Sequence, residues 1–244
     1  MIEICTDHTG KMEGIQSIST SVLLNANCQH NRKVIGAVCA HCYAENLANM
    51  YSGLEARLAR NTETLTKPIE DKDIPNIDHL EIFRFEAFGD LNNEIQLDNY
   101  VKIVRANPHT HFALYTKQYG LVQHYFVTED HVIPSNLQII FSSLMLNHPM
   151  DVDKLGITCY YEGQLKCFTV YTKEYLEKHP EIKINCGARS CNTCRLCYNP
   201  TDVKYVNEIL KSDRDAATFM IKMRDPHKKE EMIKQVSDII NKYL

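Results

Sequence analysis

The sequence predicts an α/β fold, either a barrel or an open doubly wound sheet. Short segments rich in β-branched and aromatic residues alternate with segments whose apolar residues recur at helical spacing. Strands joined through helices pair in parallel with right-handed crossovers. At 244 residues and 44% hydrophobic composition the chain can bury a full core. We expect one domain over residues 1–244, with a core over 1–165 and a cysteine-bearing C-terminal extension over 166–244.

Each predicted element follows from a local pattern. Six runs of branched and aromatic residues predict strands over residues 18–24, 80–85, 111–115, 137–141, 157–161 and 203–209. Apolar residues at helical spacing predict one helix over about 43–60 and another that includes 97–104, with Asn92 or Asn93 as its cap. A last helix begins at Asp225 and Pro226 and carries an apolar stripe, to which we assign no chemistry.

Polar and cysteine-bearing segments follow the predicted strands. In both candidate architectures ligands gather at the C-terminal ends of the strands. The segments found there cover residues 28–42, 86–90, 116–117 and 142–143. We expect them to form one site.

Composition excludes several classes of protein. The chain has 27 basic and 31 acidic side chains, for a formal charge of -4, and no basic stripe with interleaved aromatic residues. Nucleic acid is therefore expected only as a possible substrate. The start lacks a secretory signal and no apolar run approaches the ~18 residues of a spanning helix. We expect a cytoplasmic protein, where ten cysteines point to metal, catalysis or packing rather than disulfides.

The first cysteine group consists of Cys28, Cys39 and Cys42, with gaps of ten and two residues. Three cysteines cannot close a tetrahedral zinc site. They can hold three corners of a 4Fe–4S cluster and leave the fourth iron open to a substrate or cofactor.

The second group offers four thiolates within twelve residues, namely Cys186, Cys191, Cys194 and Cys197. Successive two-residue gaps favour a second 4Fe–4S cluster, with Cys186 as the fourth ligand, and structural zinc is the alternative. The remaining cysteines, Cys5, Cys159 and Cys167, are expected to be buried like small apolar residues. Cys167 would replace Cys186 if that residue proved remote.

Four segments resemble a known family. They are residues 39–44 (CAHCYA), 83–91 (FRFEAFGDL), 112–117 (FALYTK) and 191–198 (CNTCRLCY). They are similar to the phage-encoded "gene product 88" family and its radical-SAM-like relatives, and the resemblance spans residues 11 to about 200. It implies a partial (β/α) barrel of radical-SAM type with a C-terminal cysteine-cluster extension, in the cytoplasm of the host cell if phage-encoded.

The resemblance also implies site residues. Cys28, Cys39 and Cys42 would bind a cluster whose open iron chelates S-adenosylmethionine, and an electron from an unidentified donor would cleave the cofactor to a 5'-deoxyadenosyl radical. By that likeness Gly89 and Asp90 meet the methionine amine, Lys117 and Ser142 reach carboxylate or ribose, and Tyr43 packs under the cluster or contacts adenine. The second group would be an auxiliary cluster that relays electrons or anchors substrate, or else a staple for the extension.

The family's Gly-Gly-Glu turn is replaced by Phe88-Gly89-Asp90, so a non-catalytic electron-transfer or redox-sensing protein is the alternative. Arg84 and Glu86 alternate along a strand, and we expect both to point inward and form a buried pair or contact substrate. Among the histidines only His41, between two cysteines, is expected to shield the cluster, and no catalytic residue is predicted.

Overall fold

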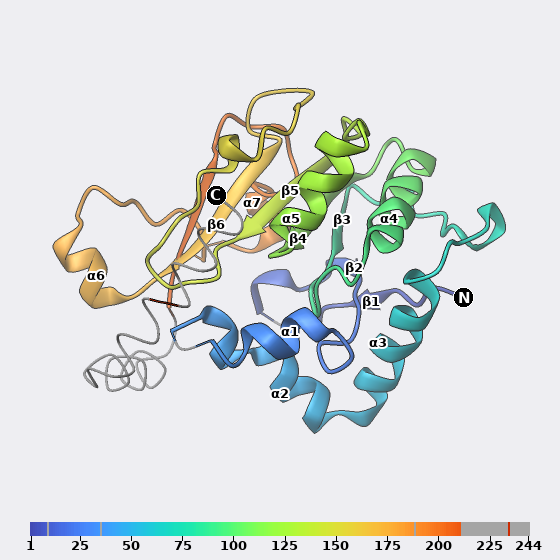
Figure 1. The fold of residues 1–244 in the computed structure, drawn as a ribbon, viewed down its shortest axis with the longest axis horizontal. Helices are drawn as coiled ribbons and strands as arrows, with labels where there is room; N and C mark the ends of the chain where they lie inside the picture. Colours follow the sequence, from blue (N-terminus) through green and yellow to red (C-terminus); the bar gives the residue numbers. More distant parts are fainter. Residues whose placement is uncertain (9, 35, 188, 211–233, 235–244) are drawn as a thin grey trace.

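The chain folds around a seven-stranded sheet (Figure 1). The computed structural model describes residues 1–210, except 9, 35 and 188, and also residue 234. The strands are β1 (Cys5–Thr6), β2 (Gln16–Ile18), β3 (Ile82–Phe85), β4 (His111–Thr116), β5 (Leu137–Ser142), β6 (Leu165–Tyr171) and β7 (Tyr205–Ile209). They lie side by side in sequence order, antiparallel for β1 and β2 and parallel for every other pair. The fold is therefore α/β with an open, mostly parallel sheet.

Helices connect most of the parallel strands. They are α1 (Ala26–Asn31), α2 (Tyr43–Met50), α3 (Ser52–Leu65), α4 (Glu94–Ala106), α5 (Tyr119–Gln123), α6 (Lys173–Lys178) and α7 (Cys191–Cys194). Short 3-10 turns lie at η1 (Gly10–Met12), η2 (Val38–His41), η3 (Asp71–Asp73) and η5 (Val152–Leu155), and η4 (His124–Thr128) is a π-helical turn. None of the helices in the described residues is both long and apolar enough to cross a membrane.

Most predicted elements are confirmed, with two corrections among the strands. Residues 18–24 form a strand only up to Ile18, because the Ser21 hydroxyl accepts hydrogen bonds from the backbone of Leu23 and Leu24 and turns the chain. The strand predicted over 157–161 is wrong. Instead, the Gln164 side chain accepts a hydrogen bond from the Tyr160 N–H and donates one to the Leu137 carbonyl at the start of β5. The parallel strand β6 begins at the next residue, Leu165.

The helix predictions need one correction. Residues 43–60 form two helices rather than one, because Tyr51 adopts an extended conformation (φ -119°, ψ 94°) between α2 and α3. The cap of α4 is Asn93, whose side chain accepts a hydrogen bond from the Gln96 N–H at 2.9 Å. The last predicted helix, from Asp225, lies outside the described residues.

The sheet has two different faces. One carries the main core, where Phe83, Phe85 and Phe112 pack with Tyr100 and Val104 of α4. The opposite face carries a smaller cluster, Ile15, Ile82, Ala113, Ile140 and Tyr198, against which Cys191 and Cys197 pack. Alternate residues of each strand supply the two faces. The second cysteine group therefore covers the side of the sheet opposite α4.

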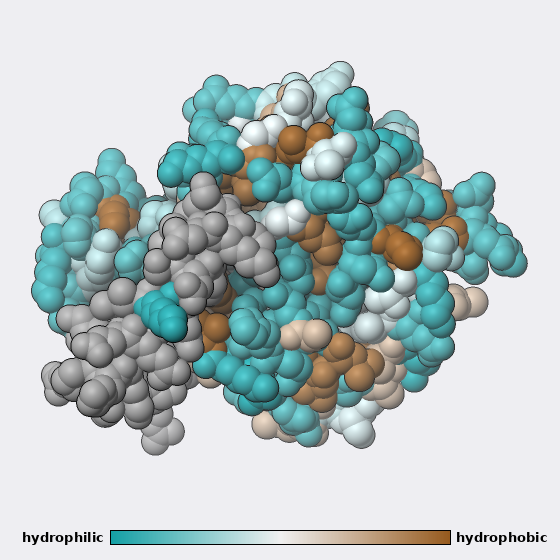
Figure 2. Space-filling model, viewed as in Figure 1, coloured by the Kyte–Doolittle hydropathy of each residue, from teal (hydrophilic) through white to brown (hydrophobic). Residues whose placement is uncertain are grey.

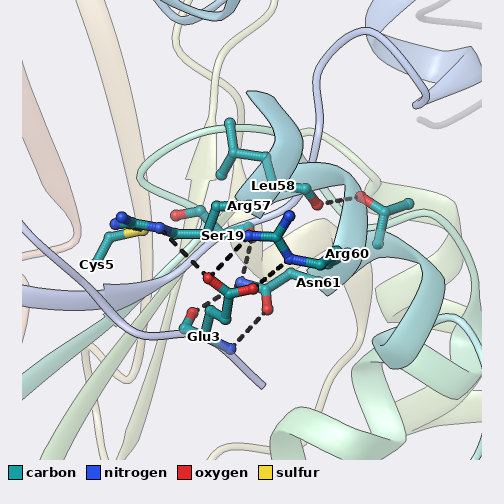
Figure 3. Close-up of polar contacts among 8 residues, drawn as sticks. Glu3, Cys5, Ser19, Arg57, Leu58, Arg60 and Asn61 are labelled. Atoms are coloured by element: carbon teal, nitrogen blue, oxygen red, sulfur yellow. Dashed lines mark hydrogen bonds and ion pairs between the residues drawn. The ribbon is translucent and has the colours of Figure 1, made fainter. Parts of the chain in front are cut away.

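The N-terminus is tied to α3 through one buried amide (Figure 3). The Glu3 N–H donates to Asn61 Oδ1 at 2.8 Å, and Asn61 Nδ2 donates to the carbonyls of Glu3 (2.8 Å) and Ser19 (3.1 Å). The Ser19 hydroxyl in turn accepts hydrogen bonds from the backbone of Ala87 and Phe88. Asn61 thus connects the start of the chain to the loop after β3.

Replacing Asn61 with alanine is expected to lower the free energy of unfolding by about 3 kcal/mol, since one buried and two partly buried backbone groups lose this partner. Urea denaturation under reducing conditions measures this loss. Asn49→Ala, at an exposed position of α2, is the control and is expected to stay within about 0.5 kcal/mol of the parent. Equal effects of the two substitutions would contradict the prediction.

Candidate metal centre

The first cysteine group follows β2 and begins at α1. The α1 cap residue Asn25 accepts a hydrogen bond from the Cys28 N–H at 2.9 Å. The Asn25 amide donates to the carbonyls of Asp90 (2.8 Å) and Leu91 (3.2 Å). Asn25 therefore holds Cys28 against the loop that follows β3.

The other two cysteines of this group lie at successive turns. Cys39 is part of η2, whose first residue Val38 donates its N–H to the Leu144 carbonyl at 2.8 Å, just after β5. Cys42 is the cap residue of α2. Segments that follow β2, β3 and β5 thus hold the three thiols in place, as the rule for parallel strands predicts.

The three thiols and the Lys117 ammonium lie close enough to interact electrostatically. Burial raises the pKa of Cys28, and the charges of Asp90 and Cys39 raise it further. Burial likewise raises the pKa of Cys39 and Cys42, while the Lys117 ammonium lowers the pKa of all three thiols. Lys117 therefore faces the group and favours its thiolate form, the form that binds metal.

The turn after β3 is strongly constrained. Gly89 has φ +81°, and a Cβ there would lie 2.4 Å from the Thr20 carbonyl oxygen, so only glycine fits. Asp90, 4% exposed, accepts hydrogen bonds from Thr116 Oγ1 (2.5 Å) and from the backbone of Lys117 (2.9 Å) and Leu91 (2.8 Å). Asp90, in the loop after β3, is thus hydrogen-bonded through both carboxylate oxygens to the end of β4.

The remaining predicted cofactor residues lie at the same end of the sheet. Tyr43 follows Cys42, its hydroxyl donates to the Ala87 carbonyl at 2.6 Å, and its ring lies 6.0 Å from that of Phe88. Ser142 ends β5 and is 8% exposed. Tyr43, Gly89, Asp90, Lys117 and Ser142 therefore all follow or end strands beside the first group. The His41 side chain lies outside the described part of the structure.

Hydrophobic residues surround the first group. Cys28 and Cys42 pack with Val22, Ala44 and Ala48. Figure 2 shows hydrophobic residues at the lower edge of the view, near α1 and α2. Exposed large hydrophobic side chains in this part of the chain are Leu24, Tyr43, Met50 and Tyr51. The first group is thus partly buried beside hydrophobic residues.

The second cysteine group forms around the single turn of α7. Ser190 caps this turn, and Arg195 ends it in the left-handed conformation (φ 52°). Cys186 lies outside α7. It forms an isolated β-bridge with Glu208 of β7, and its N–H donates to the Asn207 carbonyl at 3.0 Å. Its thiol still interacts electrostatically with those of the other three cysteines. All four predicted ligands come together.

Two cations and a tyrosine adjoin the second group. Lys11 Nζ lies 3.5 Å from the Cys186 sulfur and 2.6 Å from Glu208 Oε1. Burial raises the pKa of Cys197 to about 11, against a hydrogen bond from the Tyr115 hydroxyl and the charge of Arg84, which lower it. Sequence reasoning missed Lys11, because only the tertiary fold brings η1 to α7.

Arg84 and Glu86 do not pair, which corrects the prediction. Arg84 points toward the face of the sheet that the second cysteine group covers, and its guanidinium lies 3.8 Å from the centre of the Tyr115 ring. Glu86 has φ 58°, so the strand ends before it and its side chain turns toward α4, where Tyr100 donates to it at 2.5 Å. The left-handed conformation breaks the alternation on which the prediction depended.

The spread of the sulfur atoms bears on the metal. Thiolates around one tetrahedral zinc ion, at about 2.3 Å each, lie about 3.8 Å apart. Among the cysteines that the structure describes, no three sulfur atoms lie within 4.8 Å of one another. In this metal-free structure the sulfur atoms of each group are therefore spread more widely than around one bound zinc ion, and an all-thiolate donor set is one that both zinc and iron–sulfur clusters accept.

The other three cysteines lie apart from these groups. Cys5 and Cys167 are buried, as expected. Cys167 belongs to the main core and contacts Ser143 and Thr169, so it is no substitute for Cys186. Cys159 is exposed, which corrects the expectation for that residue.

One group of oxygen and nitrogen ligands was missed by the sequence analysis. Ligand atoms of Glu94, His124 and Glu129 lie within 4.8 Å of one another, because the π-helical turn brings Glu129 back toward His124. His124 Nδ1 is 2.6 Å from Glu94 Oε1. The three residues form a surface ion pair with a second carboxylate nearby.

A family model described as Gene product 88 matches residues 5–197. No curated protein and no solved structure matches the chain. The matched range contains β1 to β6 and both cysteine groups, and it ends at the last clustered cysteine. Because the match covers well over half of the 244 residues, the chain belongs to the Gene product 88 family.

Proposed function

We propose that the chain is an enzyme of radical S-adenosylmethionine design with two 4Fe–4S clusters on a partial barrel. Cys28, Cys39 and Cys42 hold a cluster with one open iron, and the four cysteines from Cys186 to Cys197 hold an auxiliary cluster. The observation that carries the proposal is the gathering of three thiols and Lys117 at the C-terminal ends of parallel strands. The sequential order of the mostly parallel strands supports it.

The residues around the first group suit a zwitterionic cofactor. Bound S-adenosylmethionine would supply hydrogen-abstraction chemistry after accepting one electron from an external low-potential donor. Lys117 offers a cation for the cofactor carboxylate, and Ser142 offers a hydroxyl at the end of β5. Tyr43 and Phe88 form an aromatic wall beside Cys42. Gly89 lets the chain pass close to Thr20 without obstruction.

A second candidate function is a non-catalytic iron–sulfur protein that transfers electrons or senses redox state. Asp90 favours it, because both oxygens of its carboxylate already accept hydrogen bonds from the protein. A methionine amine would have to compete with these partners. In this candidate the first cluster keeps the same three cysteines and gains a fourth ligand from the protein.

Anaerobic reconstitution followed by paramagnetic resonance tests the proposal. The full chain is expected to bind about eight iron atoms in two cubes. S-adenosylmethionine is expected to change the signal of the open cluster and, with a reductant, to yield 5'-deoxyadenosine. Adenosine, which lacks the amine and carboxylate, is the control ligand and is expected to leave the signal unchanged.

Each other outcome selects another function. Eight iron atoms with no response to S-adenosylmethionine indicate the electron-transfer protein. Zinc at stoichiometric levels without iron or sulfide contradicts both cluster proposals.

A further inference from the structure

The charges around the two cysteine groups differ. Beside the first group, the Lys117 ammonium lies next to the Asp90 carboxylate, whose charge opposes it. Beside the second group, Lys11 is paired with Glu208, and Arg84 interacts electrostatically with both Cys191 and the Asp7 carboxylate. Carboxylates therefore accompany the cations at both groups, but at the second group a cation also lies within hydrogen-bonding distance of a cysteine sulfur, with Lys11 Nζ 3.5 Å from Cys186.

Lys11 is held in place at the second group. Its ammonium lies 3.5 Å from the Cys186 sulfur, 2.6 Å from Glu208 Oε1 and 5.9 Å from the centre of the Phe168 ring. Its side chain is 25% exposed. A half-buried ammonium fixed by three contacts donates a charge-assisted hydrogen bond to a thiolate ligand.

Arg84 and Tyr115 approach the same group from the sheet. The guanidinium stacks on the Tyr115 ring at 3.8 Å and interacts electrostatically with Cys191 and Cys197. Arg84 Nε is buried and has no hydrogen-bond partner among the described residues. The Tyr115 hydroxyl is directed at Cys197. Together with Lys11, these residues place two cations and one hydroxyl around four thiolates.

We propose that Lys11, Arg84 and Tyr115 raise the reduction potential of the auxiliary cluster. The inference depends on the proposed function, since it requires a cluster at each group. Reduction adds one electron and therefore negative charge, and no bond forms or breaks. Nearby positive charge and hydrogen bonds to the sulfur ligands stabilise the reduced form. All three are positioning residues, because they act through the cluster.

A redox titration of the isolated auxiliary cluster tests the inference. In the full chain carrying Cys28→Ala, Cys39→Ala and Cys42→Ala, only that cluster is expected to form, with about four iron atoms. Adding Arg84→Gln is expected to lower the ratio of reduced to oxidised cluster about tenfold at a fixed potential, a downward shift of about 59 mV. Lys11→Gln and Tyr115→Phe are expected to shift it in the same direction, and Arg84→Lys to retain most of the parent value.

The controls separate this inference from the proposed function. Lys117→Gln in the chain with all cysteines is expected to shift the open cluster and leave the auxiliary one unchanged. Arg105→Gln, a surface arginine, is expected to shift neither. An unchanged or raised potential in all three test variants, with four iron atoms retained, overturns the inference alone. An auxiliary site without iron overturns it together with that half of the proposed function.

Discussion

Replacing Cys28, Cys39 or Cys42 with alanine is expected to remove the first cluster and leave the second intact. The iron content should fall from about eight atoms to about four, and the response to S-adenosylmethionine should vanish. The reason is geometric, because two remaining thiolates cannot hold a cube that also exposes an iron. The two groups are held by separate segments, so loss of one leaves the other in place. Iron and sulfide analysis with paramagnetic resonance measures both effects.

Two further variants make this result specific. Cys194→Ala, in α7, is expected to remove the second cluster and to keep the response to S-adenosylmethionine. Cys159→Ala is the matched control, because this thiol is exposed and belongs to neither group. It is expected to keep about eight iron atoms. An equal loss of iron in the Cys159 variant, or loss of both clusters in the Cys28 variant, would contradict the assignment.

Local patterns predicted the central part of the fold. Strands β3, β4 and β5 and helix α4 were found because each is long, buried on a regular face and bounded by turn or cap residues. The prediction failed where a side chain replaced backbone pairing. Gln164 binds the backbone beside residues 157–161, and the strand forms after it instead. The single residue Tyr51 divides the first long helix, and the spacing of the apolar residues gave no sign of this.

The candidate site was predictable to the extent that its residues are close in the sequence. The two-residue gaps between Cys39 and Cys42 and within the group from Cys191 to Cys197 predicted that these cysteines lie together, and they do, whereas the clusters themselves stay a prediction. Their surroundings were not visible in the same way. Lys11 reaches Cys186 because η1, between β1 and β2, packs against α7, although the two are far apart in the sequence. Arg84 faces Tyr115 because the two residues lie on the neighbouring strands β3 and β4. The alternation of side chains along one strand does not reveal which residue of the next strand lies opposite.

Glu86 is the clearest case in which the structure changes the chemistry of a predicted residue. Its carboxylate is 3% exposed and accepts hydrogen bonds from Tyr100 (2.5 Å), Gln96 (2.6 Å) and Thr20. Burial raises its pKa to about 8, although the hydrogen bond from Tyr100 lowers it. Glu86 therefore keeps its proton in the folded chain at neutral pH, whereas in the unfolded chain it is ionised.

This difference predicts a pH dependence of stability. Below the ordinary pKa of 4.5, both states carry the proton and the full stabilisation is present. As the pH rises from there to about 8, the unfolded chain binds fewer protons than the folded chain, so the free energy of unfolding falls. Above about 8 both states are ionised and the fall ends. The total loss is expected to reach at most about 5 kcal/mol.

Comparison with Glu86→Gln isolates this contribution from other titrating groups. Urea denaturation of both chains at pH 5, 6, 7 and 8, under reducing conditions, is expected to show a steeper fall for the parent than for the variant. Tyr100→Phe is expected to extend the fall to higher pH, because it removes a hydrogen bond that lowers the Glu86 pKa. Parallel curves for the parent and the glutamine variant would show that Glu86 is ionised in the folded chain. The hydrogen bonds that Glu86 accepts from Thr20, Gln96 and Tyr100 would then be sufficient to stabilise its buried charge.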